Sequence, residues 1–275
     1  MYRYLLPITA LLSALFACQP TPSTSSAQAP APASSFQNKA HQLVANSVEK
    51  VGTYDRLLAL KDVSYTYTYR LPDGRQDVTE EQYIFDGERS KAKFIQHDVS
   101  FVKTEGTIVQ GFDGAQAWTS IDGERTEDSA MIERAFFLRK TNFYWFAMNQ
   151  KLLDPGLSYQ YIRLDTVNNQ TYDVVEVSFG EGVGEAQDLY HLYINQKTGL
   201  IDQFLFTVMA FERSEPLLME VTYEAIDGIL LPVYRRYTPA NWEGVIIKED
   251  SWAEEISQNI RFNTGLDQAL FQSPA

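Results

Sequence analysis

The chain has 275 residues and a formal net charge of −13, from 36 acidic and 23 basic residues. This acidic balance argues against binding of nucleic acid or anionic lipid through a basic surface. Aromatic residues make up 13% of the chain, a content that suits β-strands and an apolar cavity.

The N-terminal segment leads to the single cysteine. An apolar stretch from residue 5 to residue 17 follows Arg3 and is too short to span a bilayer. Leu15, Ala17 and Cys18 stand at the −3, −1 and +1 positions of a motif that resembles the lipobox of bacterial lipoproteins. The resemblance implies cleavage before Cys18, a lipid such as palmitate on that residue, and lasting membrane attachment through two or three acyl chains. The alternative is an ordinary secretory signal with an incidental cysteine.

The residues after Cys18 indicate location and organisation. Gln19 replaces the aspartate that retains lipoproteins in the inner membrane, so the resemblance favours the outer membrane, with the protein facing the periplasm. Residues 19–35 are almost wholly Gln, Pro, Thr, Ser and Ala, which predicts an extended tether. We therefore expect a signal peptide (1–17), a lipidated cysteine with its tether (18–36) and one folded domain (37–275).

The domain is predicted to begin with a helix and to continue as an antiparallel meander. A partial apolar stripe predicts a helix from about Asn38 to Leu60, with Gly52 as a break or kink. Residues 63–69 alternate strictly between two kinds of side chain, as in a half-buried strand. Asp-Gly pairs, which favour hairpin turns, separate further predicted strands at 82–85, 94–96, 107–112 and 115–121.

A second helix is predicted from about Asp128 to Leu153. Its aromatic residues are consecutive, at 136–137 and 143–146, and therefore point to several sides of the helix. Two interpretations remain open: a helix buried between the sheet and loops, or a lid over a hydrophobic groove.

The rest of the chain is predicted to form strands. They fall at 159–164, 172–179, 189–194, 200–211, 217–225 and 231–238, with a last strand at 245–256 and a short helical turn at 267–271. The expected fold class is mainly β (α+β), with about eleven strands and two helices.

Three short stretches carry a resemblance to a known superfamily. They are GFDGAQAW at 111–118, LYINQKTGLI at 192–201 and IRFNTGL at 260–266. With the order of the elements, they resemble the LolA-like lipoprotein-sorting superfamily, which includes LolA, LolB and RseB. The resemblance implies a strongly curved antiparallel half barrel with covering helices, whose concave face receives acyl chains. The superfamily's lid arginine has no counterpart that can be placed on this sequence.

No catalytic, metal or phosphate-loop motif is visible. His41, His97 and His191 have no metal-ligand spacing, and no G-x-S-x-G motif occurs. The glycine-rich stretch 180–184 lacks the lysine of a phosphate loop and is predicted to be a hairpin loop. We therefore expect a protein that is not an enzyme and that has neither cofactor nor metal.

Two functions remain open. In the first, a monomeric, membrane-anchored lipoprotein binds a lipid, or the acyl chains of a lipoprotein, in the groove. The candidate lining residues are aromatic: Trp118, Phe136, Phe143, Trp145, Phe146 and Phe204. In the second, a sensor or interaction protein similar to RseB acts through a membrane partner. Removing apolar surface from water favours a ligand and the protein's own side chains alike, so the sequence leaves both functions open.

Overall fold

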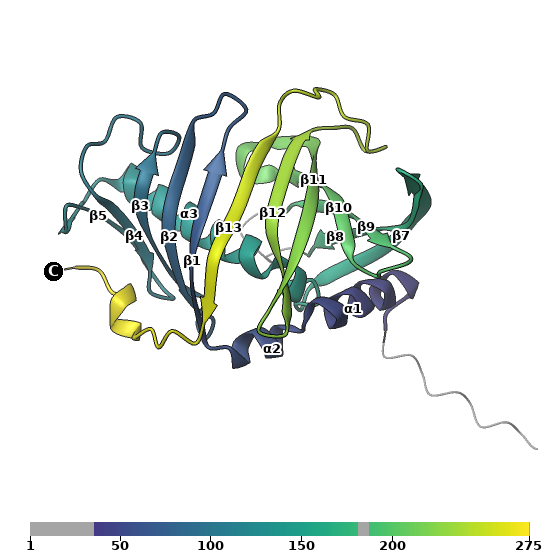
Figure 1. The fold of residues 1–275 in the computed structure, drawn as a ribbon, viewed down its shortest axis with the longest axis horizontal. Coiled ribbons are helices and arrows are strands. Elements are labelled where there is room, and N and C mark those ends of the chain that lie inside the picture. The colour runs from purple at the N-terminus through teal and green to yellow at the C-terminus, as the bar shows by residue number, and fades with distance from the viewer. Residues whose placement is uncertain (1–35, 181–186, 275) are drawn as a thin grey trace, which may run out of the picture. The chain divides into compact units, whose positions relative to one another are not determined.

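The computed structural model describes residues 36–180 and 187–274 (Figure 1). Cys18, the signal segment, most of the tether and the centre of the glycine-rich loop therefore lie outside the described residues. The residues from Phe36 onward form one compact unit.

The helix predicted from about Asn38 to Leu60 is two helices in the structure. Helix α1 (Lys39–Val51) ends at Gly52, and α2 (Tyr54–Ala59) begins after Thr53, whose hydroxyl accepts a hydrogen bond from the Arg56 amide. Gly52 has a φ of +101°, and a Cβ there would lie 2.5 Å from the Ile229 side chain. A left-handed backbone in contact with a strand thus explains the break that the sequence indicated.

Within the described residues, thirteen antiparallel strands form one open, curved sheet, so the mainly β class is confirmed and the count of about eleven is too low. The first meander comprises β1 (Asp62–Arg70), β2 (Gln76–Ile84), β3 (Arg89–His97), β4 (Ile108–Phe112), β5 (Ala117–Ile121) and β6 (Glu124–Arg125). The second comprises β7 (Leu157–Val167), β8 (Gln170–Phe179), β9 (Leu189–Asn195), β10 (Ile201–Val208), β11 (Arg213–Ile226), β12 (Ile229–Pro239) and β13 (Ala253–Phe262). The two meanders join where β13 pairs with β1.

Helix α3 (Ser129–Lys151) connects the two meanders and crosses one face of the sheet (Figure 1). Its start is fixed by Asp128, whose carboxylate accepts hydrogen bonds from the amides of Ala130 and Met131 at 2.9 and 3.3 Å. We call the face covered by α1 and α3 the inner face and the opposite face the outer face. The part of the chain that the structure describes also contains the short 3₁₀ helices η1 (Met209–Phe211) and η2 (Gln268–Phe271).

The prediction of a last strand at 245–256 is wrong for most of its length. Residues 241–252 form the connection between β12 and β13, and the strand begins only at Ala253. The apolar residues of this connection, Trp242, Ile246 and Trp252, pack against an outer-face cluster that includes Leu205 and Leu218. Their apolar character reflects this outer cover rather than a strand.

Candidate functional site

Helix α3 fills the inner face with its own side chains, beginning at its N-terminal half. Met131 and Leu138 pack on a small cluster that includes Phe94 and Ile108 from β3 and β4. The Thr119 hydroxyl donates to the Met131 carbonyl at 3.1 Å. This half of the helix is thereby fixed on β3 to β5.

The middle of α3 packs on aromatic residues of β1 and β2. The Phe146 ring lies 5.0 Å from Tyr65 and 5.6 Å from Tyr83, and the Phe143 ring lies 5.3 Å from Tyr83. The hydroxyls of Tyr65 and Tyr83 lie 2.8 Å apart, so each has a partner inside this buried cluster. Phe143 and Phe146 are therefore core residues in this structure.

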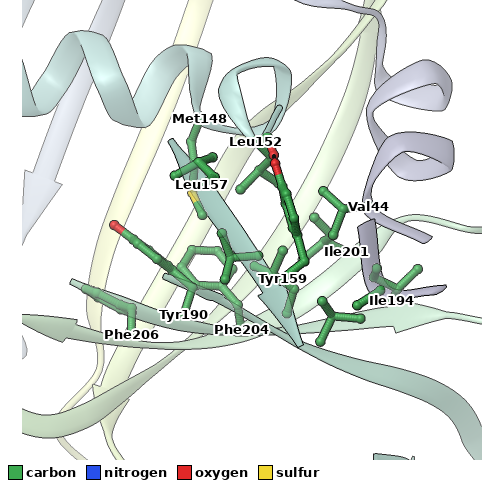
Figure 2. Close-up of a cluster of buried hydrophobic side chains, with 14 of the residues drawn as sticks. Val44, Met148, Leu152, Leu157, Tyr159, Tyr190, Ile194, Ile201, Phe204 and Phe206 are labelled. Carbon is green, nitrogen blue, oxygen red and sulfur yellow. Dashed lines mark hydrogen bonds between the residues drawn. The ribbon is translucent and has the colours of Figure 1, made fainter. Parts of the chain in front are cut away.

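The C-terminal half of α3 contributes to a larger cluster with α1 and β7 to β11, part of which Figure 2 shows. Trp145 stacks on Phe204 at 5.9 Å and meets the edge of Phe206 at 5.3 Å. Tyr190, Phe204 and Phe206 lie together on the sheet beneath Met148 in Figure 2. Aromatic side chains thus occupy the place where the sequence placed an acyl-chain groove.

Two buried arginines hold α3 on the sheet. Arg139 of α3 donates to both carboxylate oxygens of Glu81 on β2, and both side chains are fully buried. Arg235 of β12 donates to the Trp145 carbonyl at 2.5 Å, and its Nε lies 3.1 Å from Glu255 Oε2. The Arg139–Glu81 pair is costly to break, and the hydrogen bond from Arg235 to the Trp145 carbonyl is a second attachment, so the two contacts fix the position of the helix.

Burial also changes proton binding around these pairs. It raises the pKa of Glu255, and Arg235 only partly offsets that effect. It likewise raises the pKa of Tyr65 and Tyr83 well above the ordinary value, with the charge of Glu81 acting in the same direction. These tyrosines therefore serve as neutral hydrogen-bonding groups.

One end of the inner face carries apolar side chains that the fold covers incompletely. Phe137 and Tyr144 lie two turns apart on one stripe of α3. Phe137 meets Phe211 of η1 at 5.1 Å, and Tyr144 meets Phe179 at the end of β8 at 6.4 Å. Phe211 remains 68% exposed. We call Phe137, Tyr144, Phe179 and Phe211 the aromatic rim.

The structure brings only some of the predicted lining residues together. Trp145 and Phe204 are in contact, and Phe143 and Phe146 share the neighbours Tyr83 and Phe85. The other two lie apart from these four. Trp118 donates its ring N–H to the Phe271 carbonyl at 2.7 Å, and Phe136, 38% exposed, meets Phe112 on β4.

Sequence reasoning missed the rim and the charged pairs. Glu81 and Arg139 are 58 residues apart, and Phe137 and Phe211 are brought together only by the fold. No local pattern in the sequence signals such contacts.

Other features of the described residues concern surface pockets, metal ligands and membrane spans. Neither of two surface pockets, of about 390 and about 700 Å³, is lined by a residue of α3. Within residues 36–180 and 187–274, no group of three or more His, Cys, Asp or Glu side chains is arranged to hold a metal ion. No helix in this part of the chain is long and apolar enough to cross a membrane.

Comparison with known proteins gives one partial family match. Residues 124–214 match a family described as a family of unknown function, DUF6503. This stretch spans α3 and β7 to β10, and it includes all four residues of the aromatic rim. No curated protein sequence matches the chain.

Several solved structures are similar to this chain at low sequence identity. A DUF1329 family protein from Desulfovibrio piger is 13% identical, with a TM-score of 0.49 over 85% of this chain and 97% of that one. A LolA superfamily protein from Nitrosomonas europaea is 12% identical, with a TM-score of 0.48 over 85% and 97%. An outer membrane lipoprotein-sorting protein domain from Vibrio parahaemolyticus is 13% identical, with a TM-score of 0.48 over 83% and 97%. The similar structures thus include members of the superfamily that the sequence resembles.

Proposed function

We propose that this chain is a lipid-anchored envelope protein that binds an apolar ligand, a lipid or the acyl chains of a lipoprotein, at the aromatic rim. The observation that carries the proposal is the incomplete cover of apolar side chains from three separate segments. Phe137 and Tyr144 come from α3, Phe179 from the end of β8, and Phe211 from η1. An acyl chain lying across them would gain roughly 25 cal/mol for each Å² of apolar area removed from water.

The ligand reaches the interior along the rim in this proposal, and α3 does not open as a lid. Arg139 and Arg235 fix the middle and the C-terminal half of α3 to the sheet. Displacing the helix would break the buried Arg139–Glu81 pair, at a cost of roughly 3–5 kcal/mol, and would remove the Trp145 carbonyl that Arg235 binds. Rotation of Tyr144 and Trp145 next to Phe206 would instead admit a chain without breaking either contact.

The anchor is the second part of the proposal. Cys18 would carry the lipid, and Gln19 favours the outer membrane with the domain in the periplasm. Labelled palmitate should enter the chain in bacterial cells and should not enter the Cys18→Ala variant. Membrane sedimentation of that variant, unchanged from the parent chain, would contradict the anchor.

A matched pair of variants tests binding at the rim. Phe211 and Ile247 are 68% and 67% exposed, on the rim and on the outer-face connection respectively. Titration with a fluorescent fatty acid, such as cis-parinaric acid, should show binding that Phe211→Ser weakens about fivefold, since half of a phenylalanine contact is worth about 1 kcal/mol. Ile247→Ser should bind like the parent. No uptake by the parent chain, or equal loss in both variants, would contradict the proposal.

The packed inner face supports a second candidate function, contact with a membrane partner. The space under α3 is occupied by buried rings such as Phe143 and Phe146, so the domain is also suited to present a rigid surface. Crosslinking in cells should then recover one stoichiometric protein partner. Absence of such a partner, with fatty-acid binding intact, would leave the ligand-binding function alone.

A further inference from the structure

A pocket of about 390 Å³ lies on the outer face, on the side of the sheet away from α3. Two rows of side chains line it across neighbouring strands. The first row comprises Lys91, Gln82, Ser64 and Arg261, which are register partners on β3, β2, β1 and β13. The second comprises Lys93, Glu80 and Thr66, with Asn259 beside them.

The shape of the pocket follows from side-chain length. Ser64 and Thr66 on the central strand are short and form the floor. Lys91 and Lys93 on one side and Arg261 on the other are long and form the walls. Three cations therefore surround a floor of hydroxyl groups, on a protein whose net charge is −13.

These cations lack the partners that other outer-face arginines have. Arg70 pairs with Glu254 at 3.0 Å, and Arg236 pairs with Glu220 at 2.6 Å. Among the residues that the structure describes, Lys91, Lys93 and Arg261 have no carboxylate within 4.0 Å. Two acidic residues border the pocket, but the Glu81 carboxylate is bound to Arg139 on the inner face, so Glu80 alone opposes the three cations.

Lys91 shows that this arrangement has an electrostatic cost. The side chain is partly buried, and burial lowers the pKa of its ammonium group. A bound anion would offset that cost, because an opposite charge at close range stabilises the charged form. A phosphate group can also accept bidentate hydrogen bonds from an arginine such as Arg261.

We propose that this outer-face pocket binds a phosphate group carried on a hydroxyl-bearing body, as in a phosphorylated sugar or a glycerophospholipid headgroup. Lys91, Lys93 and Arg261 hold the phosphate. Ser64, Gln82 and Glu80 accept or donate hydrogen bonds with the hydroxyl groups. The volume of about 390 Å³ falls within the range of small-molecule sites. The site is separate from the aromatic rim, which lies on the other face, so either can exist without the other.

Calorimetric titration of the full chain in non-ionic detergent tests the proposal. The probes are glucose 1-phosphate, glucose, and detergent micelles that contain phosphatidylglycerol. We expect glucose 1-phosphate or phosphatidylglycerol to bind and glucose not to bind, and the affinity to fall as salt rises. Binding of glucose 1-phosphate indicates a soluble phosphosugar, and binding of phosphatidylglycerol alone indicates a lipid headgroup.

The variants Lys91→Gln/Arg261→Gln and Arg70→Gln/Arg236→Gln each remove two outer-face cations. The first pair should weaken binding at least tenfold, and the second should leave it within twofold. Urea unfolding of both variants checks that they remain folded. Binding of neither phosphate probe by the parent chain, or equal effects of the two double variants, would overturn the proposal.

Discussion

The two faces of the sheet use charged residues in opposite ways. On the inner face, the buried pair Arg139–Glu81 connects α3 to β2. The buried pair Arg235–Glu255 joins β12 to β13, and Arg235 also donates to the Trp145 carbonyl of α3. On the outer face, Arg70–Glu254 remains partly exposed, and the cations of the phosphate pocket have no carboxylate partner. Charge on the inner face thus positions a helix, whereas the three outer-face cations of the pocket stay without a carboxylate partner, as a site for an anion requires.

The largest expected effect comes from breaking an inner pair. Glu81→Gln leaves the fully buried Arg139 without a counter-ion and should lower the free energy of unfolding by about 3–5 kcal/mol. The outer-face control Glu254→Gln removes a partly exposed partner and should cost less than about 1 kcal/mol. Urea unfolding measures both values. Similar losses from the two variants would show that the faces do not differ in this way.

The next effect concerns packing along α3. Phe146→Ala opens a cavity beside Tyr65 and Tyr83 and should cost about 3–5 kcal/mol. Phe136 lies on the same helix but is 38% exposed, so Phe136→Ala should lower the free energy of unfolding by only about 1 kcal/mol. Thermal or urea unfolding compares them. Equal values would mean that the middle of α3 is not the core element described here.

The smallest effect is a pH dependence on the outer face. His191 lies beneath Trp242, with Nε2 3.1 Å from Glu176. Burial lowers the pKa of His191 below its ordinary value of 6.5, and Glu176 only partly offsets this. The unfolded chain therefore takes up the proton first as pH falls, so this contribution to stability is present above pH 6.5 and is lost below it.

His191→Gln removes that titration. The parent chain should lose more stability than the variant between pH 7.5 and pH 5.5, measured as the shift of the urea midpoint. An equal shift in both proteins would exclude His191 as the source of the pH dependence.

Local signals in the sequence predict much of the fold. The alternation at 63–69 places β1, Asp128 begins α3 within one residue of the predicted start, and Gly52 separates α1 from α2. Contacts between distant segments are not predictable in this way. The pairing of Val63 with Phe262 joins the two meanders into one sheet. The apolar residues of 241–252 resemble those of a strand because they cover the outer face.

In the candidate site, too, some features follow from local sequence and others depend on contacts between distant segments. An aromatic helix facing the strand that holds Phe204 follows from local composition, and Trp145 does lie on Phe204. The position of Trp118 depends on Phe271, 153 residues away, and no short pattern indicates it. The rim requires η1 to meet α3, which is a property of the whole sheet.

Quenching of Trp145 by a brominated fatty acid tests the central claim most directly. Trp145 lies on the inner face beside Phe206, whereas Trp242 and Trp252 lie on the outer face. We predict strong, saturable quenching in the parent chain, most of which disappears in Trp145→Phe and persists in Trp242→Phe. Absence of saturable quenching, or quenching that is lost only with Trp242, would contradict binding of an apolar ligand on the inner face.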